Sequence, residues 1–202
     1  FQHVDECFRG LLELHKAYSY IFRGDVAMMD SAFPQIVAGA FIEGGPTNVQ
    51  ESMLMYTRGE LEDWPTISWE KAAFIFMPYC FNSHWVLVRI VPKVKKLSIL
   101  DSEHSVDSNG KALLDLVTPL ARMMPHILVA MGVQTDTDTR WNIVRPKEFP
   151  KQSLSGECGV YAIAAATFTL ADRSVYTLND AVVADFRKFF TCSLWDQSWL
   201  LD

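Results

Sequence analysis

Four absences narrow the class of protein to which this chain of 202 residues belongs. It has no basic tract: the densest basic cluster is Lys93, Lys95 and Lys96, and the formal net charge is −6. Nucleic-acid binding needs clustered Lys and Arg for phosphate contacts, so this class does not fit. No apolar run reaches the roughly 20 residues that span a bilayer. We therefore expect no nucleic acid and no membrane as partner.

A signal peptide is also missing. The chain begins with Phe1 rather than Met, so we expect an excised fragment whose targeting signals could lie in the missing part. Paired cysteine spacings are absent as well, because the four cysteines stand alone at positions 7, 80, 158 and 192. This pattern predicts an intracellular, reducing compartment: cytoplasm or nucleus, or a host cell if the protein is a secreted effector. Cys80 and His84 have no second ligand pair, so we predict no metal site and no cofactor.

The composition is that of a folded globular protein. Hydrophobic residues make up 50% and charged residues 21% of the chain, which is typical of a soluble domain with a substantial core. The chain shows no internal repeat, low-complexity segment or clear linker. We therefore expect a single α+β domain over residues 1–202, with the helix in residues 1–24 as a possible accessory element.

Hydrophobic periodicity predicts the order of helices and strands. Helical spacing occurs over residues 3–22, 30–41 and 111–124, after position 158, and from about position 179. Short apolar runs predict strands at 73–77, ended by Pro78, and at 85–91 and 97–100, with further candidate strands at 127–131 and 141–144. Residues 49–57 fit either a short helix or a strand.

The passage from Lys151 to Tyr161 carries the strongest chemical signal. Cys158 stands between polar turn residues and the apolar segment 160–170, which predicts a thiol in the first turn of a buried helix. Unpaired backbone N–H groups and the helix dipole favour the thiolate there. Gln152 is close enough upstream to reach back as a hydrogen-bond donor. Taken alone, however, a cysteine at this position is more often a small packed residue than a nucleophile.

A nucleophilic cysteine needs a base and an orienting partner for that base. Five histidines are available, at 3, 15, 84, 104 and 126. His3 and His15 lie on the first predicted helix and His126 follows Pro125 in a turn, whereas His84 leads directly into the strand predicted at 85–91. Asp101 directly follows the strand at 97–100. If this strand pairs antiparallel with 85–91, His84 and Asp101 lie at the same end of the hairpin. Glu103, His104 and Asp107 are competitors for the same role that lie further into the loop.

His84-Trp85, Asp101-Ser102, and Gln152 five intervening residues before Cys158-Gly159 together resemble the cysteine proteases that cleave ubiquitin-like modifiers. These are the SUMO-specific proteases and their adenain-like relatives. The resemblance spans roughly residues 73–190, with Glu157 where many members have aspartate. It implies a papain-like variant in which a central mixed sheet is flanked by helices and the nucleophile begins a buried helix.

The resemblance also implies roles for six residues. Cys158 is expected to be the nucleophile, His84 the general base and acid, and Asp101 its orienting partner. Gln152 and the Cys158 N–H would form the oxyanion hole. Trp85 would cover a tunnel that admits only a Gly-Gly tail, with Gly156 in contact with the substrate. The implied partner is ubiquitin, SUMO, NEDD8 or a related protein, and the implied reaction is cleavage after its C-terminal Gly-Gly.

The family's other tunnel wall, a tryptophan in an N-terminal motif, has no clear counterpart. Phe33 and its neighbours occupy about the right place, and Trp64 or Trp69 could substitute. Two other functions stay open: an acetyltransferase of the related bacterial effector type, and a catalytically silent module that binds a modifier. The acetyltransferase would need basic coenzyme A and inositol phosphate sites, and the chain has no such cluster. The net charge leans slightly towards ubiquitin or NEDD8 as the modifier.

Overall fold

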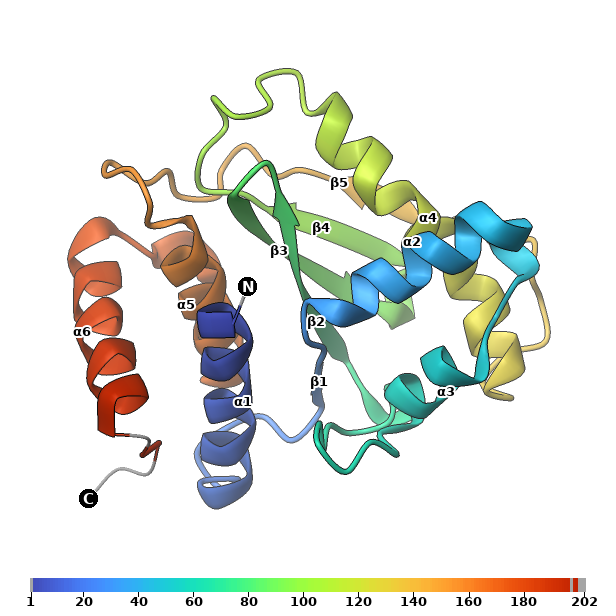
Figure 1. The fold of residues 1–202 in the computed structure, drawn as a ribbon, viewed down its shortest axis with the longest axis horizontal. Coiled ribbons are helices and arrows are strands. Elements are labelled where there is room, and N and C mark those ends of the chain that lie inside the picture. Colours follow the sequence, from blue (N-terminus) through green and yellow to red (C-terminus); the bar gives the residue numbers. More distant parts are fainter. Residues whose placement is uncertain (1, 197, 200–202) are drawn as a thin grey trace.

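A mixed five-stranded sheet forms the centre of the computed structural model, which describes residues 2–196, 198 and 199 (Figure 1). Its strands lie in chain order: β1 (Val26–Met28), β2 (Phe74–Phe81), β3 (His84–Val91), β4 (Lys96–Leu100) and β5 (Asn142–Val144). The three central strands pair antiparallel, and each outer strand pairs parallel with its neighbour. The α+β class with a central mixed sheet is therefore confirmed.

Helices cover both faces of this sheet (Figure 1). One face carries α1 (Gln2–Ala17), α5 (Cys158–Leu170) and α6 (Asp180–Asp196), and the other carries α2 (Ala32–Gly44), α3 (Glu51–Arg58) and α4 (Lys111–Ala130). Short 3-10 turns occupy Gly45–Thr47, Trp69–Lys71, Pro92–Val94 and Val175–Thr177. Residues 49–57, which fitted either a short helix or a strand, are mostly helical, because α3 begins at Glu51 and ends at Arg58.

Successive side chains along the strands point to opposite faces of the sheet, so the buried hydrophobic residues form two clusters. Leu87 and Leu100 point towards α1 and α5, whereas Val86, Val88 and Ile99 point towards α2 and α4. This is the period-two pattern of a sheet buried on both faces. The helix α5 lies in the first cluster, and its alanines at 164, 165 and 166 are fully buried, so that helix is a rigid support for its first residue.

Two tight turns fix the strand ends. Asn82 and Ser83 have φ of 49° and 62°, so they form the two-residue turn with both centres left-handed that matches strand twist. This turn pairs Phe81 with His84 across β2 and β3. Between β3 and β4 the chain passes through the 3-10 turn Pro92–Val94 and left-handed Lys95, which agrees with the turn expected there.

The predicted strand at 127–131 is wrong, because α4 continues through this segment to Ala130. Pro119 and Pro125 both lie inside that helix. A proline inside a helix costs about 3 kcal/mol, but here the apolar residues keep helical spacing and pack on the sheet. The buried members of this stripe are Leu113, Val117, Leu120, Met123, Met124, Ile127 and Leu128.

Pro78 does not end its strand, contrary to expectation, since β2 runs on to Phe81. The carbonyl of Phe76 faces β1 and accepts from Met29 N–H at 2.8 Å. Pro78 faces the same side two residues later, beyond the last pairing of β1 with β2. Its missing N–H therefore has no ladder partner to lose. The first helix also ends earlier than predicted, at Ala17.

The helix α4 is long and apolar enough to cross a membrane, judged by length and composition alone. Half of its most apolar window is buried inside the protein, where it packs with α2 and the sheet. A core helix of a folded domain passes the same test, and the packing accounts for the apolar side chains of α4.

The sheet interior should be sensitive to loss of volume. Ile99→Ala removes three carbons from a side chain with 0% exposure, and we expect it to lower the free energy of unfolding by about 2–5 kcal/mol. Ile42→Ala, at a side chain that is 84% exposed, is the matched control and should change it by less than about 0.5 kcal/mol. Urea unfolding followed by fluorescence measures both; equal losses would contradict the burial described here.

Candidate active site

Cys158 is the first residue of α5 and is 8% exposed. The chain reaches it through Gly156, whose φ of +81° is a left-handed value that favours glycine. The sulfur accepts hydrogen bonds from the backbone N–H groups of Trp85 and Gly159. The predicted nucleophile position at the start of a buried helix is therefore present in the structure, with N–H donors turned towards the sulfur.

His84 and Asp101 meet at the same end of the β3–β4 hairpin, as their positions in the sequence predict. Leu87 pairs with Leu100, and this register brings His84 Nε2 to 2.8 Å from Asp101 Oδ1. Both side chains are buried. The His84 ring also hydrogen-bonds the Cys158 thiol, so the three predicted side chains form one chain of contacts, in the order Cys158, His84, Asp101.

Electrostatics in this group favour the thiolate–imidazolium pair. Burial lowers the pKa of His84, but hydrogen bonds to Asp101 and Cys158 outweigh it and raise that pKa to about 9. For Cys158, burial raises the pKa, while the hydrogen bonds from His84 and from the Trp85 N–H lower it further than burial raises it. The thiol is therefore more acidic than an ordinary cysteine, as a nucleophile near neutral pH requires.

Asp101 has two further partners besides His84. The Glu103 N–H donates to Oδ1 at 2.8 Å, and Arg145 forms an ion pair with Oδ2 through Nη2. Burial raises the pKa of Asp101, but the hydrogen bonds from His84 and Glu103, with the nearby Arg145 charge, hold it below its usual range. Asp101 thus stays ionised although no part of it reaches solvent.

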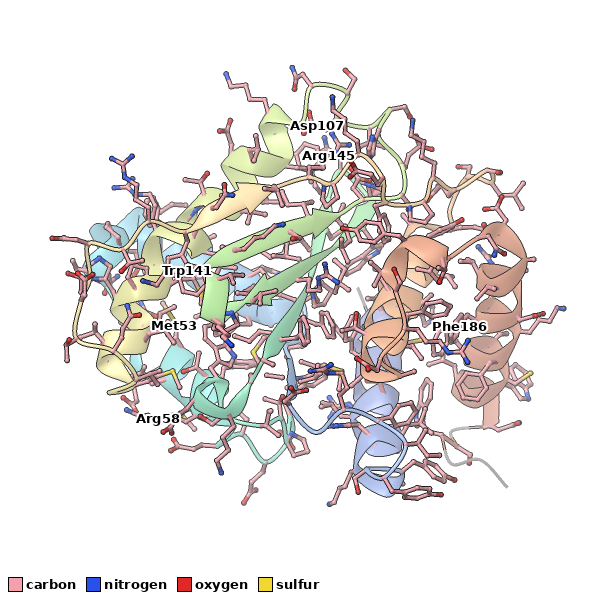
Figure 2. The ribbon with its side chains drawn as sticks, turned by 180° about the vertical axis from the view of Figure 1, so that it is seen from behind. Met53, Arg58, Asp107, Trp141, Arg145 and Phe186 are labelled. Atoms are coloured by element: carbon pink, nitrogen blue, oxygen red, sulfur yellow. The ribbon has the colours of Figure 1, made fainter. Side chains whose placement is uncertain are left out.

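The sequence reasoning missed Arg145. This residue follows β5 and donates through Nη1 to the Asp107 carbonyl at 2.5 Å. Figure 2 shows the two residues side by side, next to the end of the sheet. No local motif marks Arg145, and its partner Asp101 comes from a different part of the chain. Asp107 contacts Arg145 rather than His84, and the Glu103 side chain accepts from Ser105; neither displaces Asp101.

Gln152 lies in the turn before Cys158 but is tied to its own surroundings. Its Nε2 donates to the Leu154 carbonyl at 3.1 Å, and its Oε1 accepts from Ser102 Oγ at 2.9 Å. Its backbone N–H donates to the Ser102 carbonyl. Ser102 directly follows Asp101, so the loop that carries Gln152 is attached to the strand that carries Asp101. One of the two amide protons on Nε2 remains for another acceptor.

A second attachment holds this loop against the helices. Asp180, the first residue of α6, accepts from Ser153 Oγ at 2.5 Å and from Tyr161 Oη at 2.7 Å. Tyr161 lies one turn into α5. The helix α6 is in turn held against α5 by aromatic packing, since the ring of Phe186 (Figure 2) lies 6.1 Å from that of Phe168 on α5, centroid to centroid. The turn before Cys158 is therefore fastened at both ends.

A groove of about 770 Å³ opens beside Cys158. Trp85 and Gly156, the two predicted substrate contacts, both line it. The remaining lining comes mainly from the helices α1, α5 and α6, including His3, Val4, Cys7, Ile163, Arg187, Leu194 and Trp195. The predicted site residues thus lie around one concavity, with the thiol at its wall.

The residues considered for a second tunnel wall are elsewhere. Trp64 and Trp69 are buried, one in each hydrophobic cluster, and Phe33, on α2, is fully buried as well. The Trp64 indole N–H donates to the Met28 carbonyl at 2.7 Å. None of the three lines the groove. These positions do not supply the wall, because each is committed to the core.

Residues 49–194 match the model of the Ulp1 protease family, C-terminal catalytic domain. The chain belongs to this family. It is a cysteine peptidase, in agreement with the resemblance found in the sequence. The matched residues include Cys158, His84, Asp101 and Gln152, and exclude α1 and α2. No curated protein matches the chain.

Solved structures of Ulp1 proteases share the fold of this Ulp1-family chain. The SUMO protease Ulp1 with its catalytic cysteine oxidised to a sulfinic acid has a TM-score of 0.66 and 17% identity, over 98% of this chain and 77% of that one. The Ulp1 domain in complex with Smt3, the yeast ortholog of SUMO, gives 0.65 and 16%, over 98% and 76%. The Ulp1-like SUMO protease of Chaetomium thermophilum gives 0.54 and 18%, over 88% and 63%.

Among the described residues of this Ulp1-family chain, no group of three or more His, Cys, Asp or Glu side chains is arranged to hold a metal ion.

The paired state of Cys158 predicts selective alkylation. At pH 6 an ordinary thiol, with a pKa of about 8.5, is almost wholly protonated, but Cys158 should still react with iodoacetamide. His84→Ala should slow this reaction at least about tenfold at pH 6, because the imidazolium partner is lost. Cys7, whose pKa burial raises to about 12, is the internal control. Mass spectrometry of each peptide gives the rates, and equal labelling of Cys7 and Cys158 would contradict the pairing.

Proposed function

We propose that this Ulp1-family peptidase cleaves the bond that follows the C-terminal Gly-Gly of a ubiquitin-like modifier. The bond is the peptide bond of a precursor or the isopeptide bond to a lysine of a conjugate. The observation that carries the proposal is the contact chain from Cys158 through His84 to Asp101, beside a groove lined by Trp85 and Gly156. Membership of the Ulp1 family supports it.

In the proposed reaction, the Cys158 thiolate adds to the carbonyl carbon of the terminal glycine and forms a tetrahedral oxyanion. The C–N bond then breaks, and the His84 imidazolium gives its proton to the departing amine. A thioester between Cys158 and the glycine remains. His84, now neutral, takes a proton from water as that water attacks the thioester. The C–S bond then breaks, the modifier leaves as a free carboxylic acid, and the Cys158 thiolate and His84 imidazolium are restored.

Asp101 supports both proton transfers in this scheme. Its hydrogen bond to Nε2 leaves Nδ1 as the ring nitrogen that faces Cys158, and it stabilises the imidazolium. The oxyanion would be held by the N–H groups at the start of α5 and by the remaining amide proton of Gln152. The hydrogen bonds to Ser102 and Leu154 fix the plane of the Gln152 amide, and with it the direction of the remaining N–H.

The proposed partner is a ubiquitin-like protein. One structural neighbour is a complex of the Ulp1 protease domain with Smt3, the yeast ortholog of SUMO, which supports this class of partner. Trp85, at the entrance of β3 and half-buried in the groove, would lie over the tail. A tail of two glycines passes where larger side chains would clash.

We also propose a reducing compartment for the protein. All four cysteines are free: Cys7 and Cys158 are buried, Cys80 is partly buried and Cys192 is exposed. A peptidase that depends on a thiolate works in such a compartment without oxidative loss of its nucleophile.

Electrophilic modifier probes test the proposed substrate class. We expect ubiquitin, SUMO or NEDD8 bearing a C-terminal electrophile to form a covalent adduct with the wild type, one of them much faster than the others. Cys158→Ala should abolish the adduct, whereas Cys192→Ala, at an exposed thiol, should leave it unchanged. Intact-mass spectrometry measures the adduct. If no modifier probe labels Cys158 while iodoacetamide still does, the cysteine is active and the proposed substrate is wrong.

The oxyanion role makes a separate prediction for Gln152. Gln152→Ala should lower kcat by about 10²–10³-fold, because one donor to the tetrahedral intermediate is lost, and should leave KM within about threefold. Gln134→Ala removes a comparable amide that donates to the Asp136 and Pro125 carbonyls and serves as the matched control. A rise in KM without a fall in kcat would assign Gln152 to ground-state binding instead.

A further inference from the structure

We propose that Arg145 is a positioning residue that holds the Asp101 carboxylate in the orientation in which it supports His84. The proposal rests on the proposed catalytic set of Cys158, His84 and Asp101, but not on the identity of the modifier. Arg145 pairs with Asp101 and is not among the residues that line the groove, so it acts through Asp101.

A buried carboxylate needs hydrogen-bond donors for both of its oxygens. Asp101 is 0% exposed, and a buried charge without partners is costly. Its Oδ1 accepts from His84 Nε2 and from the Glu103 N–H, both at 2.8 Å. Its Oδ2 pairs with Arg145 Nη2. Arg145 therefore fixes the second oxygen, and with it the rotation of the carboxylate plane that aims the first oxygen at the imidazole.

Arg145 is itself well held. Its side chain is only 11% exposed, and Nη1 donates to the Asp107 carbonyl at 2.5 Å. Gly110 closes the other side, since a Cβ added there would lie 3.3 Å from Nη1. The guanidinium thus bridges a loop carbonyl and the Asp101 carboxylate with two different nitrogens. A planar fork of donors does this, whereas the single ammonium of lysine reaches one partner at a time.

The sheet topology explains why this arginine arrives there. The strand β5 pairs parallel with β4, with Val144 beside Ser98. The residue after β5 is therefore carried towards the end of β4, where Asp101 stands. The loop between Asp101 and α4 folds back over the same end, because the Leu113 N–H donates to Asp107 Oδ2 at 2.9 Å. Arg145 joins β4, β5 and this loop at the site.

The charged groups around Asp101 set the expected pH dependence. His84 faces it from β3, Glu103 and His104 from the following loop, and Arg145 from the end of β5. The carboxylate must be ionised to support the imidazolium. Without the Arg145 cation the pKa of Asp101 rises, so the carboxyl becomes protonated at a higher pH as the solution is acidified. The acid limb of activity should then move to higher pH.

The test compares Arg145→Met, Arg145→Lys and Arg23→Met. Arg23 is a matched control, because it also forms ion pairs with carboxylates, but with Asp25 and Asp172 rather than with a proposed catalytic residue. Arg145→Met should lower the rate of Cys158 alkylation at pH 6 and lower kcat for a modifier substrate by about 10–100-fold. KM should stay within about twofold and the acid limb should move to higher pH. Arg145→Lys should keep the wild-type acid limb, since the cation is kept, but should restore kcat only in part, since an ammonium cannot bridge Asp101 and the Asp107 carbonyl together.

A double-mutant cycle decides whether Arg145 acts through Asp101. Asp101→Asn and the double variant Asp101→Asn/Arg145→Met should have nearly equal alkylation rates, because Arg145 has no carboxylate left to hold. Losses that multiply, or an Arg145→Met variant with wild-type kcat and pH profile, would overturn the proposal. If Arg145→Met fails to fold by circular dichroism, Arg145→Lys is compared with Arg145→Gln, and equal kcat and equal acid limbs in that pair would also overturn it.

Because alkylation of Cys158 needs no modifier, this test separates the two proposals. If Arg145→Met slows alkylation of Cys158 as expected but the wild type cleaves no modifier, the positioning role of Arg145 stands and the proposed substrate is refuted.

Discussion

The buried Asp101 carboxylate is the constraint on which the active-site end of this molecule depends. A carboxylate with no exposure stays ionised only if the fold brings donors to it, because water cannot. Those donors come from β3, from the chain after β4 and from the chain after β5. Their convergence requires the β3–β4 register, the parallel pairing of β5 and the loop before α4 to be correct at once. The geometry of the proposed catalytic residues is thus a property of the sheet rather than of any single loop.

The other half of the site depends on α5. A helix apolar on nearly all sides needs cover on all sides, and it receives that cover from the sheet, α1 and α6. Its first turn therefore cannot tilt without disturbing a core. The helix α1 lies outside the residues matched by the family model, yet Asp5 accepts from the Ser31 N–H and hydroxyl. This contact ties α1 to the start of α2, so the N-terminal helix is part of the frame that supports Cys158.

A feature could be predicted from the sequence where the residues that determine it lie close together in the chain. The hairpin of His84 and Asp101 depends on two apolar strands and a short turn, and the start of α5 depends on one polar turn before one apolar run, so both were visible. The strand β1 has three residues, too few for alternation to show. Residues 127–131 look like a strand by composition alone; only packing on the sheet makes them helical. Arg145 could not be found, because its partner is 44 positions away and no spacing rule joins them.

The missing tryptophan wall has a physical explanation in the core. Trp64 and Trp69 fill the two hydrophobic clusters, and moving either to the groove would leave a cavity that costs several kcal/mol. The side of the groove near Trp85 is instead approached by α1. A Cβ on Gly159 would lie 3.3 Å from Val4 Cγ2 and 3.6 Å from Trp85 Cδ1. The absence of a side chain directly after the nucleophile therefore lets α1 and β3 close on α5 together. An aliphatic side chain from the N-terminal helix thus stands beside Trp85 at the place where the thiol meets the groove.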